Sequence, residues 1–222
     1  MAKNVLLFLG APGAGKGTLA QRCCSMLNYE QVSTGNLCRE HVAQSTDIGK
    51  KIDLALKSGR LIDDGLITAM VLQWFASYSE KQHIILDGYP RTVMQAEAFH
   101  HFVEQEQTIK PTVIHLTVDE QTVVNRLGMR LICSKSGCQA VYSFAADSDT
   151  VTPRCQKCAA LLVRRPDDEA AAIKKRLKLY RAHETALLDC YRRLNYEIAV
   201  LDASGAAEEI FDALRIKLDV LV

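Results

Sequence analysis

Short apolar runs alternate with longer amphipathic segments along the chain. Val5 to Leu9 is continuously apolar, which is typical of a strand buried on both faces of a parallel sheet. Strands are expected at residues 5–9, 29–32, 83–86, 112–118 and 198–201. Helices are expected at residues 16–27, over much of 37–77 with a break around 58–60, at 92–106, from 119 to about 131, at 168–194, and after the last strand. This alternation predicts an α/β fold with a parallel sheet wrapped by helices.

The stretch from Cys133 to Arg165 breaks this rhythm. It has few helical signals, scattered turn residues and four of the eight cysteines. Such a stretch predicts a small module inserted into the α/β fold. The chain shows neither an internal repeat nor a low-complexity tract.

Composition narrows the class of partner. Over 222 residues, 48% are hydrophobic and 24% charged, as in an ordinary globular protein. The formal net charge is only +1, from 27 basic and 26 acidic side chains. This balance argues against a nucleic-acid or membrane-surface partner, because both usually require a basic excess. It is compatible with a small anionic ligand, which needs only local positive charge.

The expected compartment is the cytoplasm. No stretch reaches the roughly 20 apolar residues of a membrane span. The apolar run at the N-terminus is too short for a signal peptide, and Gly10 to Gly17 interrupts it. Cysteines without a secretory signal indicate a reducing compartment, where clustered thiols bind metal more often than they form disulfides.

The segment after the first expected strand carries the first chemical signature. It reads Gly10, Ala11, Pro12, Gly13, Ala14, Gly15, Lys16, Gly17 and Thr18. This fits the phosphate-loop pattern G-x-x-x-x-G-K between a strand and a helix, where backbone N–H groups converge on phosphate. Lys16 adds a point charge for the β and γ phosphates. Gly17 stands where many such loops have a Mg²⁺-binding Ser or Thr, so we expect the metal to be held mainly through water, substrate phosphates and a distant carboxylate.

A second motif, Ile85 to Gln95, begins at the carboxyl end of another expected strand. Ligands bind at that end in open α/β sheets. Asp87 is placed to face the metal, and Arg91 is suited to gripping a phosphate through two N–H groups. Gln95 follows one helical turn later with an amide suited to pairing with a base edge.

The phosphate loop, Asp87-Gly-Tyr-Pro-Arg91 and Ser33-Thr-Gly35 together resemble the adenylate kinases of the nucleoside-monophosphate kinase family. The resemblance covers essentially the whole chain, in family order, and fits the longer form with a full lid. It implies a P-loop three-layer parallel sheet flanked by helices. The implied divisions are a core of residues 1–32, 63–125 and 166–222, a helical monophosphate-binding segment of residues 33–62, and a lid of residues 126–165.

The resemblance also implies residues for a reaction that converts ATP and AMP into two ADP. Lys16 and the loop amides would bind the ATP phosphates, Mg²⁺ would accompany ATP, and Ala203 would lie near the ATP adenine. The monophosphate site would comprise Thr34, Arg39, Arg60, Leu61, Ile62, Gly88, Arg91 and Gln95. Within it, Thr34 and Gln95 would lie near the adenine and the arginines on the α-phosphate.

A further set of charged residues would act on the transferring phosphate. Arg126 and Arg130 are four residues apart, which predicts that they share one helical face. The resemblance places this pair between ATP and the transferring phosphate, with Arg126 also binding ATP. In the family's Arg-x-Asp-Asp segment, the arginines clamp phosphate and the aspartates orient them. The residues expected to carry catalysis are Lys16, Asp87, Arg91, Arg126, Arg130, Arg165, Asp167, Asp168 and Arg176.

Two positions depart from the family pattern. Asn36 occupies a position where aspartate is usual, which keeps the size and the helix-capping capacity but removes a negative charge near the metal. We expect an altered rate without loss of activity, because Asp87 is still present. Ala203 takes the place of the glycine in the usual Asp-Gly and is expected to be a small perturbation.

The cysteines of the expected lid are Cys133, Cys138, Cys155 and Cys158. Four thiolates suit a closed tetrahedral Zn²⁺ site, although the first pair is separated by four residues where zinc-bearing lids of this family typically have two. We expect structural zinc that stabilises a module without a core of its own, with a metal-free lid or disulfides as alternatives. The other cysteines are expected to be packed or exposed thiols on helices.

Other activities are compatible with parts of this pattern. The nearest alternative activity is that of a UMP or CMP kinase, but the long lid and Gln95 argue against it. A kinase that uses GTP in place of ATP as the donor is poorly distinguished by the sequence. A nucleotide-sensing zinc protein without activity would lack some of the arginines or Lys16, and a P-loop GTPase would not explain residues 87–95. We expect a monomer whose lid and residues 33–62 close on nucleotide.

Overall fold

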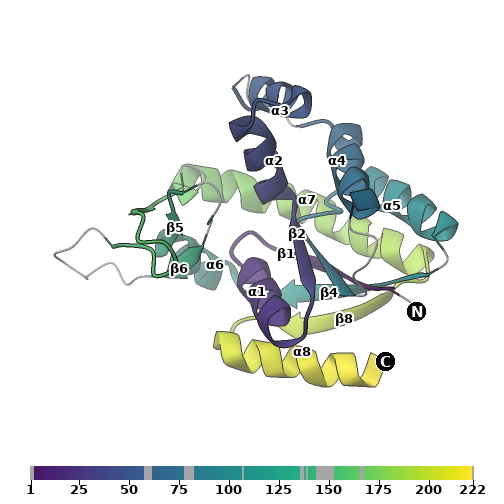
Figure 1. The fold of residues 1–222 in the computed structure, drawn as a ribbon. Helices are drawn as coiled ribbons and strands as arrows, with labels where there is room; N and C mark the ends of the chain where they lie inside the picture. Colours follow the sequence, from purple (N-terminus) through teal and green to yellow (C-terminus); the bar gives the residue numbers. More distant parts are fainter. Residues whose placement is uncertain are drawn as a thin grey trace.

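A five-stranded parallel sheet forms the centre of the molecule (Figure 1). The computed structural model describes residues 3–57, 62–77, 83–106, 108–135, 138, 140–143, 153–165 and 168–221. The strands follow the order β2-β3-β1-β4-β8. Their bounds are β1 (Lys3–Gly10), β2 (Glu30–Ser33), β3 (His83–Asp87), β4 (Ile109–Thr117) and β8 (Glu197–Asp202). All five expected strands are present, with small shifts at their ends.

Helices cover both faces of this sheet. They are α1 (Lys16–Met26), α2 (Thr34–Ala43), α3 (Asp47–Lys57), α4 (Asp64–Ser77), α5 (Val93–Gln105), α6 (Glu120–Gly128), α7 (Ala170–Arg193) and α8 (Ala207–Leu221). Figure 1 shows α1 and α8 on one side of the strands, and α5 and α7 on the other. Within the described part of the chain, no helix has both the length and the apolar character needed to cross a membrane.

The alternating side chains of β1 explain these layers. Val5 and Leu7 are buried in one hydrophobic cluster, together with side chains from α4, α5 and α7. Leu6 and Phe8 are buried in a second cluster, against α1 and α8. Because successive residues of a strand point to opposite faces, a continuously apolar strand needs cover on both sides. The predicted α/β fold is therefore confirmed.

The register of the strands brings the predicted motifs to one edge of the sheet. Asp87, the last residue of β3, lies opposite Phe8 of β1 and Ser33 of β2. Gly10, which ends β1, lies opposite Leu116 of β4. The segments that follow these strands are therefore neighbours, although they are far apart in the sequence.

The stretch that breaks the strand–helix rhythm forms a second, antiparallel sheet. Its strands are β5 (Arg130–Cys133), β6 (Val141–Ser143) and β7 (Leu162–Val163), in the order β6-β5-β7. Among the described residues of this stretch, four are buried: Cys133, Ala140, Cys155 and Leu162. As expected, the described residues of this stretch contain no long helix.

One predicted element is wrong. Asp119 caps α6 as expected, with its carboxylate accepting the N–H of Thr122 at 2.9 Å, but the helix ends at Gly128 and does not reach Leu131. Arg130 instead begins β5 and lies opposite Ser143 of β6. Pairing with a strand outside the local sequence overrides the helical spacing, so Arg126 and Arg130 do not share a helical face.

The close approach of α2 and α3 gives a test of the packing around Gly49. A Cβ added there would lie 2.0 Å from the carbonyl oxygen of His41. We expect Gly49→Ala to lower the free energy of unfolding by on the order of 1–3 kcal/mol in urea denaturation, despite the roughly 1 kcal/mol helix-propensity advantage of alanine. Gly128→Ala is the matched control, because no atom lies within 4 Å of its added Cβ. Equal stability of the two variants would contradict this account.

Candidate active site

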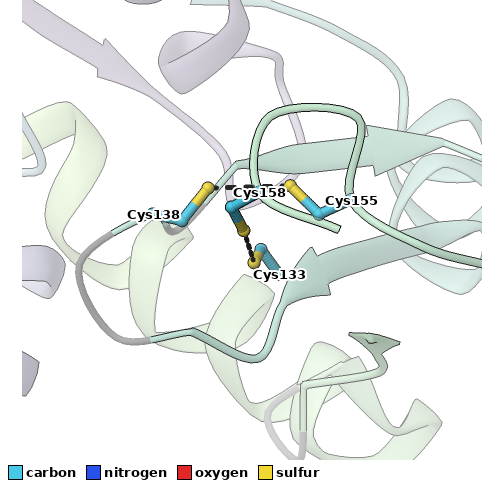
Figure 2. Close-up of side chains that lie close together, drawn as sticks. All are labelled: Cys133, Cys138, Cys155 and Cys158. Atoms are coloured by element: carbon cyan, nitrogen blue, oxygen red, sulfur yellow. Dashed lines mark hydrogen bonds between the residues drawn. The ribbon is translucent and has the colours of Figure 1, made fainter. Parts of the chain in front are cut away.

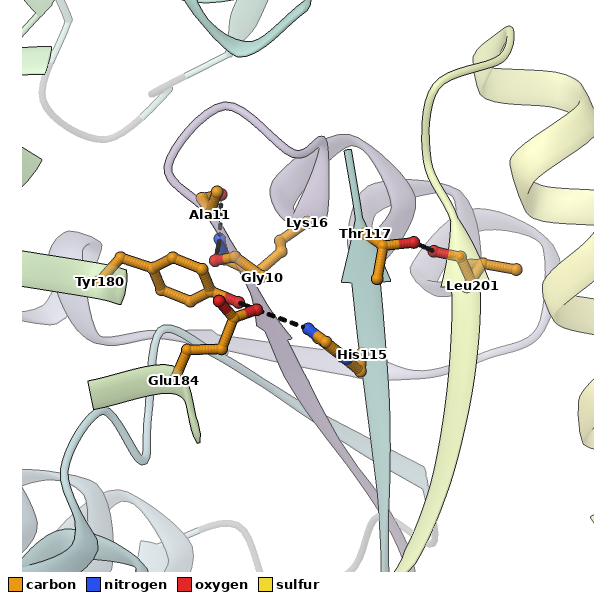
Figure 3. A network of polar contacts seen from close by, with 8 residues as sticks. All are labelled: Gly10, Ala11, Lys16, His115, Thr117, Tyr180, Glu184 and Leu201. Carbon is orange, nitrogen blue, oxygen red and sulfur yellow. Dashed lines mark hydrogen bonds and ion pairs between the residues drawn. The ribbon is translucent and has the colours of Figure 1, made fainter. Parts of the chain in front are cut away.

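The phosphate loop lies between β1 and α1 and closes around Lys16 (Figure 3). The Lys16 ammonium donates hydrogen bonds to the carbonyl oxygens of Gly10 at 2.6 Å and Ala11 at 2.9 Å. Gly13 and Gly15 have φ values of 85° and 92°, which side-chain-bearing residues rarely adopt. A Cβ on Gly13 would also lie 2.9 Å from Leu127, so this position requires glycine for two reasons.

The Lys16 ammonium is buried, and the positive charges of several arginines act on it. Burial of its ammonium lowers the pKa of Lys16 from 10.5 to about 8, against the opposing effect of the Asp87 carboxylate. The charges of Arg91, Arg176 and Arg130 lower the pKa further. These cations come from three separate parts of the chain, and the charge of each acts on Lys16. Such an environment favours a ligand with several negative charges.

Asp87 lies directly against the phosphate loop. A Cβ on Gly17 would be 3.5 Å from its Oδ2 atom. The side-chain amide of Gln31 on β2 donates to the same oxygen at 3.0 Å and holds the carboxylate in place. Sequence reasoning did not single out Gln31, because nothing in its local pattern marks a partner on the neighbouring strand.

Several predicted monophosphate-site residues meet at Gly88. The Thr34 hydroxyl donates to the Gly88 carbonyl oxygen at 2.9 Å, and Arg91 Nε donates to the same oxygen at 2.7 Å. Arg39 donates to the side-chain oxygen of Asn36, the position that departs from the family pattern. Among the other predicted residues, Ile62 packs partly buried against the main core, whereas residues 60 and 61 lie outside the described residues.

Gln95 is buried, with 4% of its surface exposed, and both ends of its amide are bound. Its Oε1 accepts the backbone N–H of Arg91 at 2.8 Å. Its Nε2 donates to Asp64 Oδ1 at 2.7 Å. Asp64 was also missed from the sequence, where an acidic residue in the first turn of a helix is ordinary.

A carboxylate joins two arginines on the side of the small sheet. Asp168 accepts from Arg130 Nε at 2.7 Å and from Arg176 Nη1 at 3.2 Å, and only 3% of its side chain is exposed. Its own backbone N–H donates to the Arg165 carbonyl oxygen at 3.0 Å. The structure thus brings these four predicted residues together. The predicted Asp167 lies outside the described residues.

Arg126 lies at a different place from Arg130. Its guanidinium donates to the carbonyl oxygens of Ala203 at 2.7 Å, Gly205 at 3.0 Å and Ser204 at 3.2 Å. It therefore spans the loop between β8 and α8. Arg126 and Ala203, both predicted on the ATP side, are direct neighbours.

A polar network behind the loop ties β4 to α7 (Figure 3). The Glu184 carboxylate accepts from the Tyr180 hydroxyl at 2.6 Å and pairs with Nε2 of His115 at 2.9 Å. Burial and this carboxylate raise the pKa of Tyr180 well above its ordinary value. A cavity of about 240 Å³ beside the network is lined by Tyr180, Glu184 and Ala11, among others. His115 is thus a core histidine.

The four cysteines of the small sheet converge on one point (Figure 2). All four sulfur atoms lie within 4.8 Å of one another, with Cys133 and Cys158 at 3.4 Å and Cys138 and Cys155 at 3.6 Å. These distances are too long for disulfides, whose sulfurs are about 2.05 Å apart. The Tyr142 hydroxyl, 3.3 Å from Cys155, lowers the pKa of that thiol and favours its thiolate.

The predicted site residues of the main sheet share one edge, where parallel strands end in a glycine-rich loop with Lys16 and in the segment that carries Asp87 and Arg91. This architecture is that of the P-loop nucleotide-binding proteins. The comparison with protein families is more specific: residues 8–196 match the family model of adenylate kinases.

Individual proteins agree with this match. The chain is 35% identical to the adenylate kinase of Thermosipho africanus over 213 residues, which are 95% of this chain and 99% of that protein. It is 35% identical to the adenylate kinase of Fervidobacterium nodosum, with 94% of each chain covered. For the adenylate kinase of Archaeoglobus fulgidus, the identity is 34%, over 92% of this chain and 95% of that one. The chain belongs to the adenylate kinase family.

The depressed pKa of Lys16 predicts proton uptake when ATP binds. Without nucleotide, burial holds the pKa of Lys16 at about 8, so just above that pH more than half of the protein molecules carry a neutral Lys16. Phosphate charges beside the ammonium raise the pKa again. We expect uptake of a fraction of a proton at a pH of about 8.5 and almost none from this group at about 6.5, where Lys16 is already charged.

Titration calorimetry in buffers of different ionisation enthalpy measures this uptake. Lys16→Arg is the matched control, because it keeps the charge but does not titrate in this range. Uptake at the higher pH that persists in Lys16→Arg would assign the proton to another group and contradict the prediction.

Proposed function

We propose that the chain is an adenylate kinase that catalyses the reversible transfer MgATP + AMP ⇌ 2 ADP. The observation that carries the proposal is the meeting of the phosphate loop, Asp87 and Arg91 at the ends of β1 and β3. The charges of Arg91, Arg130 and Arg176 also act on Lys16 there. Two nucleotides bring several phosphate charges into one site. Phosphoryl transfer requires little covalent chemistry from the protein, so positioning and charge neutralisation account for most of the catalysis.

On the donor side, Lys16 and the amides of residues 10–18 bind the ATP phosphates. Arg126 and Ala203 form a wall beside the adenine, supported by the hydrogen bonds that fix Arg126 on the loop after β8. Asp87 lies close enough to the loop to hold Mg²⁺ through water, in keeping with the glycine at position 17. Mg²⁺ bound with ATP supplies neutralisation of phosphate charge.

On the acceptor side, Arg39 and Arg91 bind the α-phosphate of AMP. Thr34, Gly88 and Gln95 line the place of the adenine, and residues 60–62 complete it. The contacts of Thr34 and Arg91 with the Gly88 carbonyl oxygen support this arrangement, because they join base-side and phosphate-side residues at one point.

The remaining arginines act on the phosphate in transfer. Asp168, together with Asp167, holds Arg130, Arg165 and Arg176 in place. We assign residues 33–62 to the monophosphate segment, residues 126–165 to the lid, and residues 1–32, 63–125 and 166–222 to the core. Closure of both segments on nucleotide excludes water, which would otherwise hydrolyse the γ-phosphate.

The cysteine cluster binds structural zinc in this proposal. Zn–S bonds of about 2.3 Å in a tetrahedral site place the sulfurs about 3.8 Å apart. The observed pairs at 3.4 and 3.6 Å fit such a site with a small expansion. Bound metal holds together a small sheet that has only a few buried residues. The cluster takes no part in catalysis, and we place the protein in the cytoplasm as a monomer.

The acceptor preference tests the activity directly. We expect strong ADP formation from MgATP with AMP and at most weak formation with UMP, CMP or GMP, followed in a coupled assay. Arg91→Lys should lower kcat/KM for AMP by on the order of 100-fold, because it loses two-point phosphate binding, while ATP affinity stays nearly constant. Turnover with a pyrimidine monophosphate would show instead a kinase for that class of acceptor. No turnover with any acceptor would contradict the proposed kinase activity.

Metal analysis tests the cysteine site. We expect roughly one zinc ion per chain in the purified protein and its loss in Cys158→Ser, with a lower melting temperature. Cys24→Ser is the control, because Cys24 lies on α1, outside the cluster. A metal-free wild-type protein with the same melting temperature as Cys158→Ser would show that these thiols do not depend on metal.

A further inference from the structure

Asp64 sits where the N-termini of α4 and α5 meet, and both of its carboxylate oxygens are used. Oδ2 accepts from the Thr92 hydroxyl at 2.6 Å, and Oδ1 accepts from Gln95 Nε2 at 2.7 Å. Asp64 is the first residue of α4, and Thr92 caps α5 by accepting the N–H of Gln95 at 3.2 Å. Negative charge is stabilised at helix N-termini, so the position suits a carboxylate.

These contacts fix the orientation of the Gln95 amide. Its nitrogen and oxygen are similar in shape, so only the hydrogen-bond partners distinguish the two possible orientations. An ionised carboxylate only accepts hydrogen bonds, and the backbone N–H of Arg91 only donates. The amide nitrogen must therefore face Asp64, and the amide oxygen must face Arg91. In the reverse orientation, the amide nitrogen would face the N–H of Arg91, donor against donor, and the amide oxygen would face the Asp64 carboxylate, acceptor against acceptor.

The backbone of Gln95 is held as well. Its N–H is bound by Thr92, and its carbonyl oxygen accepts from the Tyr89 hydroxyl at 3.3 Å. Tyr89 is buried, with 1% of its surface exposed. The residue cannot adjust to a different base by a small shift of the helix, which leaves the amide orientation as the determinant of what it recognises.

A fixed amide distinguishes two classes of purine. After binding Asp64 and Arg91, Gln95 keeps one N–H and one oxygen lone pair for a ligand. A 6-aminopurine offers a donor at its amino group and an acceptor at N1, which is the complementary pair. A 6-oxopurine offers the reverse, an acceptor at O6 and a donor at N1. A site with fixed polar groups rejects a ligand that leaves them unpaired.

We propose that Asp64 is a positioning residue that sets the acceptor base: by fixing the Gln95 amide, it makes the site accept a 6-aminopurine monophosphate and reject a 6-oxopurine monophosphate. The proposal rests on the proposed function, in which Gln95 faces the base of the acceptor.

The test compares AMP with IMP, which differ at the 6-position and at the N1 hydrogen. Asp64→Ala and Asp64→Leu both remove the acceptor for Gln95. We expect either variant to reduce the ratio of kcat/KM for AMP to that for IMP by about tenfold or more, mainly through KM. Asp64→Asn, which keeps an oxygen facing Gln95, should restore most of the discrimination.

Asp63→Ala is the matched control. Asp63 is the neighbouring carboxylate and caps the same helix by accepting the N–H of Leu66 at 3.0 Å, but its carboxylate has no contact with Gln95 among the described interactions. Its loss should lower the stability of α4 by about 1 kcal/mol, and the AMP-to-IMP ratio should stay unchanged. A purely structural role of Asp64 would give the same result for both positions.

The outcomes separate this proposal from the proposed function. If the wild-type protein converts AMP and its AMP-to-IMP ratio is unchanged in whichever of Asp64→Ala and Asp64→Leu stays folded by circular dichroism, the positioning role is overturned. If the wild-type protein fails to convert AMP, the proposed function fails instead. A ratio that falls equally in Asp63→Ala would also overturn the role assigned to Asp64.

Discussion

The gathering of several positive charges in one enclosed space is the constraint on which the rest of the site depends. Lys16, Arg91, Arg130 and Arg176 repel one another, and burial of the lysine adds to the cost. Carboxylates offset part of it: Asp87 acts on Lys16, and Asp168 binds both Arg130 and Arg176. The parallel sheet keeps Lys16, Asp87 and Arg91 close, because the ends of β1 and β3 meet in fixed register. Arg130 and Arg176 come from the small sheet and from α7. The stored repulsion favours any ligand rich in phosphate, and the carbonyl oxygens of Gly10 and Ala11, which accept from the Lys16 ammonium, offset a further part of it.

Features encoded locally could be predicted from the sequence, and features that depend on distant pairing could not. The apolar run of β1 and the cap at Asp119 depend on a few adjacent residues, so both were predictable. The end of α6 was not, because Arg130 pairs with Ser143 on another strand. Asp64 and Gln31 were missed for the same reason: each binds a functional residue far away in the chain. Motifs therefore identified the residues suited to meet a nucleotide, and Asp168 among those that hold them, but not Gln31 or Asp64.

The two sheets are stabilised by different means. The main sheet buries apolar side chains on both faces, and its helices supply two large clusters. The small sheet has only a few buried residues, two of them cysteines of the sulfur cluster. A module of that size gains little from apolar burial, since surface outweighs interior at small sizes. The proposed metal bound by the four thiols would stabilise the module in place of a large core. The cysteine spacing alone was enough to predict that the thiols would meet, despite the longer first loop.

Base recognition and part of the charge neutralisation are assigned to different layers of the molecule. Gln95 is buried and bound at the edge of the sheet through both backbone and side-chain contacts. Arg39 lies on α2, and Arg130 lies on the small sheet, outside the central layers. A hydrogen-bond pattern discriminates only if its donors and acceptors cannot turn, whereas a charge attracts phosphate over a range of positions. The proposed kinase, which closes on two nucleotides, therefore combines a fixed amide for the base with guanidinium groups outside the central layers for part of the phosphate charge.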